Sequence, residues 1–526
     1  MTVATLPSHS RPELFARRWA VLGVMSVSLV LVVMSVSGLN VALPTLVREL
    51  GATARQLQWI VDAYALVFAA LLLTAGAIGD RFGRKGALLA GFAVFGSGAA
   101  ASALASSANQ LIATRALMGV GAALIMPATL SIIVSVFPPE ERSKAISIWA
   151  GVAGLGGTLG QITSGTLLSA STWQWLFLAL IPIVLLAAGA TVRLVPTSRD
   201  EARRPLDLGG AGLSLVAMAA LVFAIIEAPE LGFTDPAIIT AAAVAVVAGL
   251  LFVAWQRLAP YPMLPLQLVS DRRVRTGLGV IAAVFAAMFA LFFLLTQYLQ
   301  FVQGWGPLKA GFANLPIAVG LMIAAPKSDD LVTRFGTRRV ITGGLVAMTL
   351  GFAGLATLDA TTAYWQLAIP MALLGLGAGA AMAPSTTSVM AALPASKAGL
   401  SSALNDTSRE VGAVLGIAVL GSVASSIYRT DLADALAEVP QDLAETVKAS
   451  AGAGLAAAQE IGGIAGSDLH DAIAIGFSRG VAVAFAFASV VVAVAALAVW
   501  SSMRRETGAP DARVSVGTAE VLDERT

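Results

Sequence analysis

The stretch Gly79-Asp80-Arg81-Phe82-Gly83-Arg84-Lys85 lies between two long apolar segments and determines how the rest of the chain is interpreted. A similar stretch, Arg334-Phe335-Gly336-Thr337-Arg338-Arg339, occurs about 250 residues later in the same kind of position. A short basic turn used once in each half of a largely apolar chain is typical of a transporter built from two related helical bundles. The sequence therefore predicts an internally repeated membrane protein.

The composition favours a membrane over water as the solvent of this chain. Of its 526 residues, 57% are apolar and 12% are charged, and the mean hydropathy is +0.83. Soluble domains carry about 25% charged residues. The pI is near 9.0, but a net charge of +2 and short, separate basic clusters argue against a nucleic-acid partner. The absence of cysteine excludes disulfides and thiolate chemistry.

Long apolar stretches recur along the whole chain. A helix that crosses a bilayer needs about 20 mainly apolar residues, and about fourteen stretches meet that length. We expect an all-α polytopic membrane protein with fourteen transmembrane helices, arranged as two six-helix bundles and two extra linking helices. The expected spans are 19–42, 56–78, 86–105, 110–136, 145–169, 175–195, 206–228, 236–255, 276–300, 311–326, 340–358, 365–391, 400–427 and 477–501.

The connections between these spans suggest the domain boundaries and the orientation. We expect an N-terminal bundle at 1–195, a linker with the two extra spans at 196–275, a C-terminal bundle at 276–503 and a tail at 504–526. Arg and Lys favour one side by about four to one, which places both termini in the cytoplasm. The extracellular insertion at 428–476 is expected to form two amphipathic helices broken by Pro440 and Gly462-Gly463. It is either a tolerated surface insertion or a lid over the outer vestibule.

The basic turn after the second span has the chemistry of a conformational latch. Asp80 at the end of one helix can form ion pairs with basic residues at the start of the next, and glycines permit the tight reversal. Such a cluster can hold the two bundles together in one conformation and release them in another. Simple positive-inside anchoring is the alternative for each basic residue. The expected latch residues are Gly79, Asp80, Arg81, Gly83, Arg84 and Lys85.

Five of the ionisable residues inside the apolar spans stand out. A charge at the bilayer centre costs about 2.5–3.5 kcal/mol on insertion scales, so it usually faces a cavity or a partner. Asp62 and Arg115 lie at similar depths in the second and fourth spans and are expected to be able to pair. Asp406 and Arg409 lie one turn apart in the thirteenth span. Glu227 is at the outer end of the seventh span, where a snorkelling side chain is the alternative to a functional one.

Several motifs resemble the major facilitator superfamily, and in particular its fourteen-helix drug:proton antiporters of the EmrB/QacA type. The segment from Gly76 to Lys85 is similar to the superfamily's loop motif. Leu111, Arg115, Gly119 and Gly121 are similar to its fourth-helix motif. Segments similar to the antiporters are Asn40-Val41-Ala42-Leu43-Pro44, Gln58-Trp59-Ile60-Val61-Asp62-Ala63-Tyr64, Tyr298-Leu299-Gln300 and Asn405-Asp406-Thr407-Ser408-Arg409-Glu410.

The resemblance implies roles for further residues. Asp406 matches an acidic position of the antiporters' thirteenth helix, whereas Ser35 stands where their first helix often has Asp. The fifth span resembles an exporter motif whose small residues let helices pack closely; these are Gly156, Gly160, Ser164 and Gly165, with Gln161 in place of the usual proline. The residues expected to line a substrate cavity are Ser35, Asn40, Trp59, Tyr64, Gln161, Phe289, Phe293, Gln297, Tyr298, Gln300 and Asn405.

Function is narrowed by the motifs that the sequence lacks. It has no phosphate loop, which favours a secondary transporter, and both histidines, His9 and His470, lie outside the spans, which argues against most intramembrane enzymes. We predict a proton-coupled multidrug efflux antiporter in which Asp62 and Asp406 exchange protons for lipophilic cations. A dedicated exporter of one metabolite or antibiotic, a lipid flippase and a membrane sensor remain alternatives. We expect a monomer in a bacterial cytoplasmic membrane, with small lipophilic substrates, protons and the bilayer as partners and no cofactor but the proton gradient.

Overall fold

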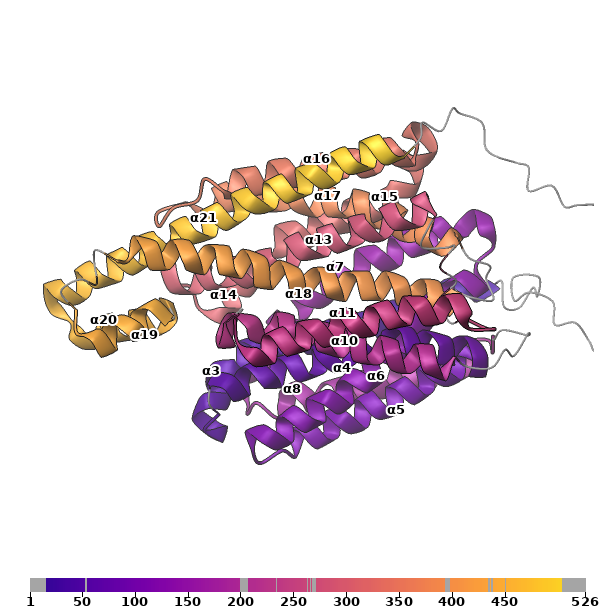
Figure 1. Cartoon of the computed structure of the whole chain (residues 1–526), viewed down its shortest axis with the longest axis horizontal. Helices are drawn as coiled ribbons and strands as arrows, with labels where there is room; N and C mark the ends of the chain where they lie inside the picture. Colours follow the sequence, from indigo (N-terminus) through magenta and orange to yellow (C-terminus); the bar gives the residue numbers. More distant parts are fainter. Residues whose placement is uncertain are drawn as a thin grey trace, which may run out of the picture.

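The computed structural model describes residues 16–52, 54–198, 207–232, 234–262, 264, 266, 271–392, 398–433, 436, 439–449 and 451–503, and all of the regular secondary structure in them is helical. The long helices run roughly side by side, with the N-terminal half on one side and the C-terminal half on the other (Figure 1). The expected tail at 504–526 lies outside the described residues.

The helices divide into an N-terminal half, a linking pair and a C-terminal half. The N-terminal half contains α2 (Arg18–Ser37), α3 (Leu39–Leu50), α4 (Ala54–Phe82), α5 (Arg84–Ala103), α6 (Ala108–Val136), α7 (Pro139–Ala170), α8 (Trp175–Leu178) and α9 (Leu180–Leu194). The linking pair is α10 (Leu208–Leu231) and α11 (Pro236–Leu258). The C-terminal half contains α13 (Arg272–Gln297), the π-helical turn η2 (Tyr298–Val302), α14 (Pro307–Phe312), α15 (Leu315–Phe335), α16 (Thr337–Leu355), α17 (Tyr364–Ala391), α18 (Ala398–Asp431), α19 (Gln441–Ala449), α20 (Ala451–Ile461) and α21 (Gly463–Ser502).

Twelve helices in the described part of the chain are long and apolar enough to cross a membrane. This confirms a polytopic helical protein but not the expected count of fourteen. The two expected spans outside the twelve are 145–169 and 340–358, where the structure has the helices α7 and α16. Both pack among the other long helices, α7 against α2 and α15, and α16 against α17 and α21.

The insertion between the last two expected spans is helical, with one change of boundary. The helices α19 and α20 project beyond the ends of the neighbouring helices (Figure 1) and pack toward the start of α21. The positive φ angles of Gly462 (61°) and Gly463 (62°) produce the expected break. However, α21 starts at Gly463, so residues 463–476 belong to the last long helix and not to the insertion.

The repeated basic turn has the same backbone feature in both halves. Gly83 joins α4 to α5 with φ at 114°, and Gly336 joins α15 to α16 with φ at 80°. A side chain is strained at such angles, so glycine is needed at both positions. The two long helices of each half therefore reverse direction in the same way, as the sequence echo predicts.

Each half of the molecule has its own apolar core, and the linking pair, α10 and α11, lies beside the seam between the halves. One core is built mainly from residues between Val21 and Val195, and the other from residues between Val280 and Val499. The helix α10 packs against α4 of the first half and α18 of the second, as well as against α11. The seam between α4 and α18 is therefore covered by the linking pair along this side.

Close packing of α7 on α2 depends on the small residues that the sequence singled out. A Cβ atom at Gly156 would lie 3.0 Å from Val33 Cβ, and one at Gly160 would lie 2.8 Å from the carbonyl oxygen of Met34. Ser164 lies directly against Gly38. Gly165 faces the other half, where a Cβ would lie 3.4 Å from Leu308 Cδ1. The expected role of these residues in helix packing thus has a direct steric basis.

We expect Gly160→Leu to destabilise the protein by about 2 kcal/mol, because overpacking a filled interface forces backbones apart. The thermal unfolding temperature of purified protein measures this. Gly157→Leu is a matched control, since a Cβ at Gly157 meets no atom within 4 Å. Equal unfolding temperatures for the two variants would contradict the assignment of the tight face.

Candidate functional site

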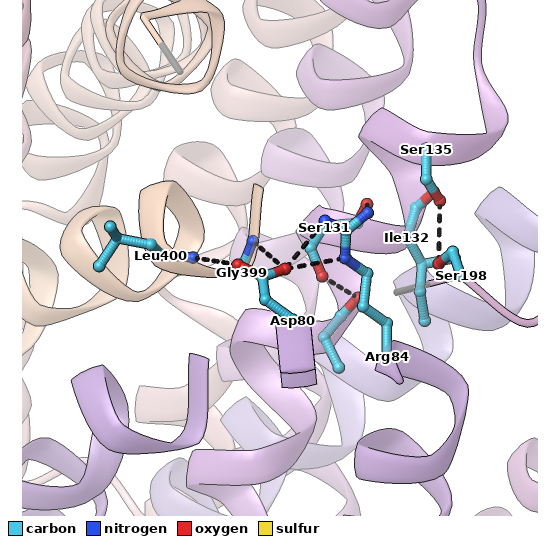
Figure 2. A network of polar contacts seen from close by, with 9 residues as sticks. Asp80, Arg84, Ser131, Ile132, Ser135, Ser198, Gly399 and Leu400 are labelled. Atoms are coloured by element: carbon cyan, nitrogen blue, oxygen red, sulfur yellow. Dashed lines mark hydrogen bonds and ion pairs between the residues drawn. The ribbon is translucent and has the colours of Figure 1, made fainter. Parts of the chain in front are cut away.

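Asp80 connects the two halves of the molecule at the predicted cytoplasmic end (Figure 2). Its Oδ1 accepts hydrogen bonds from Arg84 Nη2 at 2.8 Å and Nε at 3.0 Å, and from the backbone N–H of Gly399 at 3.0 Å. Its Oδ2 accepts from the N–H of Leu400 at 3.1 Å. Gly399 and Leu400 are in the first turn of α18, where unpaired N–H groups and the helix dipole favour a carboxylate. A side chain of one half therefore caps a helix of the other.

The remaining latch residues have local roles within the first half. Arg84 also donates to the carbonyl of Ser131 at 3.4 Å, and its N–H donates to Ser198 O at 3.0 Å (Figure 2). Lys85 Nζ donates to Val192 O at 2.8 Å. Arg81 lies over the Phe82 ring with its Cζ 5.2 Å from the centroid. The expected six-residue latch is thus narrower in the structure: Asp80 and Arg84 form the buried ion pair and Gly83 forms the turn, whereas Gly79 lies within the last turn of α4.

The linking segment contacts the same end of α18 from another direction. The Leu400 side chain packs in a small apolar cluster with Phe252 of α11 and Leu264 of the following connection. Gln256 accepts a hydrogen bond from the N–H of Leu264 at 2.9 Å and donates to Asp207, the N-cap of α10, at 2.6 Å. The start of α18 is therefore held both by Asp80 and by the linking pair.

A second group of polar side chains lies farther along α18, at the seam between the halves. Asp406 is buried, and its Oδ1 accepts from Asn405 Nδ2 at 3.1 Å and lies 3.9 Å from Arg409 Nη1. Thr386 of α17 donates to Asn405 Oδ1 at 3.0 Å. These contacts place Asn405 in a polar network rather than on an open cavity wall. They also bring together Asp406 and Arg409, as their spacing predicts.

Aromatic rings from both halves enclose the Arg409 guanidinium. Its Cζ lies 4.9 Å from the ring centre of Trp149 on α7 and 5.1 Å from that of Phe285 on α13. Both distances are within the range of cation–π attraction. Trp149 is fully buried and was not among the residues expected at the site. The sequence around Trp149 does not indicate this contact, because Arg409 lies in the other half of the chain.

Glu410 is the ionisable residue that the sequence interpretation missed. It is half-buried and follows Asp406 by one helical turn, near enough to Asp406, Arg409 and Tyr64 for electrostatic interaction. Three charged residues within five positions of one apolar helix form a signal that the sequence did offer.

Arg115 does not form the ion pair with Asp62 that their similar depths in the second and fourth spans suggest. The Nε of Arg115 donates to the carbonyl of Ile60 at 3.2 Å, and its Cζ lies 4.5 Å from the Tyr64 ring centre. Ser35 lies beside Tyr64, and its own hydroxyl donates to Val32 O at 2.8 Å. Similar depth in two helices does not ensure that the side chains face each other, and here Asp62 is half-buried elsewhere on α4.

Two expected site residues have surroundings that differ from the expectation. Tyr298 is buried and donates to the backbone oxygen of Asp359 at 2.6 Å, so it anchors the connection between α16 and α17. Glu227 is 1% exposed, which contradicts a snorkelling side chain. It lies on α10, which packs against α4, α11 and α18.

The other expected cavity residues are dispersed. Trp59 contacts Phe223 of α10 at 6.1 Å between ring centres, and Phe289 stacks on Phe285 at 5.6 Å. Phe293 is 45% exposed, and the Gln297 amide donates to its carbonyl at 3.3 Å. Gln161 accepts a hydrogen bond from Asn314 at 3.4 Å, Gln300 is half-buried in η2, and Ser35 lines a cavity of about 20 Å³ between α2, α7 and α8. The side chain of Asn40 lies outside the described residues.

We expect Tyr298→Phe to lower stability by about 1 kcal/mol, the usual contribution of a buried hydrogen bond, and to leave transport unchanged. Thermal unfolding and transport assays on the same preparation measure both effects. Tyr261→Phe, at a position that is 51% exposed, is the control and should change neither quantity. Loss of transport without loss of stability would instead support a cavity role for Tyr298.

Comparison with known proteins identifies the family of this fold. The model of the Major Facilitator Superfamily matches residues 25–417. The chain belongs to the major facilitator superfamily. It is therefore a transporter rather than an enzyme.

Relatives of this transporter match over three quarters of its length or more. It is 35% identical to the methyl viologen resistance protein SmvA of Salmonella typhimurium, covering 93% of this chain and 99% of that one. It is 34% identical to the multidrug efflux pump LfrA of Mycolicibacterium smegmatis, covering 95% and 98%. It is 33% identical to the methylenomycin A resistance protein of Streptomyces coelicolor, covering 76% and 85%.

Solved structures show the same fold at low sequence identity. The human organic anion transporter MFSD10 aligns with a TM-score of 0.59 and 14% identity, over 92% of this chain and 99% of that one. A bacterial homologue of the human lysosomal transporter Spinster aligns with a TM-score of 0.60 and 16% identity, over 94% and 100%. These alignments show that the overall fold is shared.

Proposed function

We propose that this transporter is a proton-coupled antiporter that exports lipophilic, often cationic, drugs by alternating access. The observation that carries the proposal is the position of α18. This one helix contributes Asp406, Arg409 and Glu410 to the buried seam, and its first turn is capped by Asp80 of the other half. A change of charge at the seam and release of the cap therefore act on the same helix.

The charged side chains of α18 supply the coupling groups in this proposal. A buried carboxyl group disfavours its anionic form unless a cation is nearby. Asp406 has Arg409 at 3.9 Å and Glu410 interacts with both, so a proton or a substrate cation can compete for these carboxylates. Asp62 and Glu227 are further candidate acids, and Arg115 is a fixed charge in the first half.

Alternating access requires two seams that open in turn. One is formed by α4 and α18 and is capped by Asp80. The other is formed by α7 and α15, where Ser147 and Ser328 share a hydrogen bond at 3.2 Å. We propose that the N-terminal bundle at 1–195 and the C-terminal bundle at 276–503 rock about these seams. In this proposal α7 and α16 are also membrane spans, which gives the fourteen helices of the EmrB/QacA type with both termini in the cytoplasm of a bacterial cell.

The names of the relatives support drug export and leave two substrate ranges to compare. SmvA and LfrA are named for methyl viologen resistance and for multidrug efflux. Other relatives are named for one antibiotic each, methylenomycin A and tetracenomycin C. A broad range of lipophilic cations is the favoured interpretation, because the site has two aromatic faces beside a carboxylate. A dedicated exporter is the second candidate.

Purified protein in liposomes with an imposed pH gradient tests the proposal. Addition of tetraphenylphosphonium or methyl viologen is expected to release protons from the vesicles in proportion to the cation taken up. A panel of dyes and antibiotics separates the two candidates, since a dedicated exporter responds to one compound. Uptake that is independent of the pH gradient would contradict proton coupling, and movement of a labelled lipid alone would favour a flippase.

A further inference from the structure

The Arg409 guanidinium is held unusually for a buried cation. It is 3% exposed, yet its Nε and Nη2 atoms have no hydrogen-bond partner among the described residues. Its ion pair with Asp406 is long, at 3.9 Å. The neighbours that suit the flat guanidinium best are the ring faces of Trp149 and Phe285. Buried arginines normally satisfy several of their five N–H donors, so this pocket fits a guanidinium poorly.

The same pocket fits a different cation better. Two aromatic faces attract a delocalised positive charge, and one carboxylate balances it. A flat cation without N–H donors would leave no donor unsatisfied there, whereas the guanidinium leaves two. The walls come from both halves, since Trp149 is on α7 while Phe285 and Asp406 are on α13 and α18. A ligand between them would touch both halves at once.

We propose that Trp149, Phe285 and Asp406 form the binding site for a flat, delocalised organic cation, and that Arg409 is a tethered cation that occupies this site when the substrate is absent. This inference rests on the proposed function and names its substrate class. Substrate entry displaces the guanidinium toward Glu410, with which it already interacts. The exchange raises the number of cations beside the two acids from one to two, so Asp406 and Glu410 each have one cation and neither buried positive charge is left without an acid.

Binding of two matched dyes to purified protein in detergent tests the site. N-methylacridinium is a flat cation without N–H donors, and acridine at pH 8 is its neutral counterpart. Trp149→Leu is expected to weaken N-methylacridinium binding about tenfold, the loss of one desolvated cation–π contact, and to change acridine binding less than threefold. Phe285→Leu should act in the same direction, which covers the case in which one variant fails to fold. Unchanged binding of the cation in folded samples of both variants would overturn the proposal.

A matched control and a double substitution separate displacement from simple charge repulsion. Trp500 lies 3.9 Å from Arg338 Cζ in a similar contact outside the seam, so Trp500→Leu should leave the dissociation constant unchanged. Arg409→Gln should strengthen N-methylacridinium binding about tenfold by removing the competitor. If Arg409 competes for the ring face, this gain shrinks in the Trp149→Leu background. An equal gain in both backgrounds would show repulsion only and would overturn the tethered-cation role.

The binding assay is independent of transport. Dye binding in detergent requires no pH gradient, so the expected pattern together with uncoupled vesicles would reject the proposed antiport and retain the site. Proton-coupled transport together with unchanged dye binding in Trp149→Leu and Phe285→Leu would reject the site and retain the proposed antiport.

Discussion

Asp406→Asn is expected to reduce pH-gradient-driven transport by about a hundredfold, because it removes a titratable group and leaves Arg409 without its ion-pair partner. Removing one member of a buried pair costs about 3–5 kcal/mol, since the other charge stays in a medium of low polarity. The asparagine keeps the shape of the side chain and its contact with Asn405, so the protein should still fold. Transport in proteoliposomes, with and without the gradient, measures the loss of coupling.

Two further variants make this result specific. Asp468→Asn changes an exposed acid on the projecting part of α21 and should transport at the wild-type rate. Glu410→Gln tests the acid one turn beyond Asp406. Wild-type coupling in Asp406→Asn with lost coupling in Glu410→Gln would move the coupling role to Glu410, and wild-type coupling in both would remove α18 from the mechanism.

Asp80→Ala is expected to open the predicted cytoplasmic end of the seam between α4 and α18. The substitution removes the hydrogen bonds to Gly399 and Leu400, which join the two halves, and also the ion pair with Arg84, which lies within the first half. Hydrogen bonds to a charged group contribute about 1.5–3 kcal/mol each. A loss of about 3 kcal/mol in the closed conformation shifts the equilibrium between closed and open by about a hundredfold. In the proposed mechanism the two hydrogen bonds to α18 are made only in the closed conformation, so their loss does not destabilise the open one.

Cysteine labelling measures this opening directly, because the chain has no native cysteine. Ala403 is fully buried on α18 and faces Gly76 of α4, so Ala403→Cys reports on the seam. A membrane-impermeant maleimide should label this position at least tenfold faster in the Asp80→Ala background. Arg81→Ala is the control, since Arg81 contacts Phe82 and not α18, and it should label at the rate of the parent. Fast labelling in the control would show that the whole turn, rather than Asp80, closes the seam.

The sequence predicted helix positions and the repeated turn well because both depend on local properties. Apolar length determines where a helix crosses a bilayer, and a required positive φ angle explains Gly83 and Gly336. The pairing of Asp406 with Arg409 was predictable for the same reason, since residues three positions apart lie on one helix face. The small residues of α7 likewise indicated a close helix contact.

The remaining site could not be predicted, because it depends on how separate helices are rotated against each other. Depth along a helix suggested that Asp62 would pair with Arg115, but Arg115 faces Ile60 and Tyr64. Trp149 reaches Arg409 only through the packing of α7 against the second half, which no local pattern encodes. The sequence places Glu227 near the end of an apolar span, but its side chain is buried in the structure. The helix that carries it, α10, packs against α4, α11 and α18.

The uninterrupted course of α18 has a thermodynamic consequence. Asp406 follows Gly399 by seven residues, about 10 Å along one helix, so both contacts belong to one rigid body. Binding of a proton or cation at Asp406 and formation of the Asp80 cap are then thermodynamically linked, so each changes the free energy of the other by the same amount. Weakening the cap should therefore alter how strongly the acid retains its proton, although the two groups never touch.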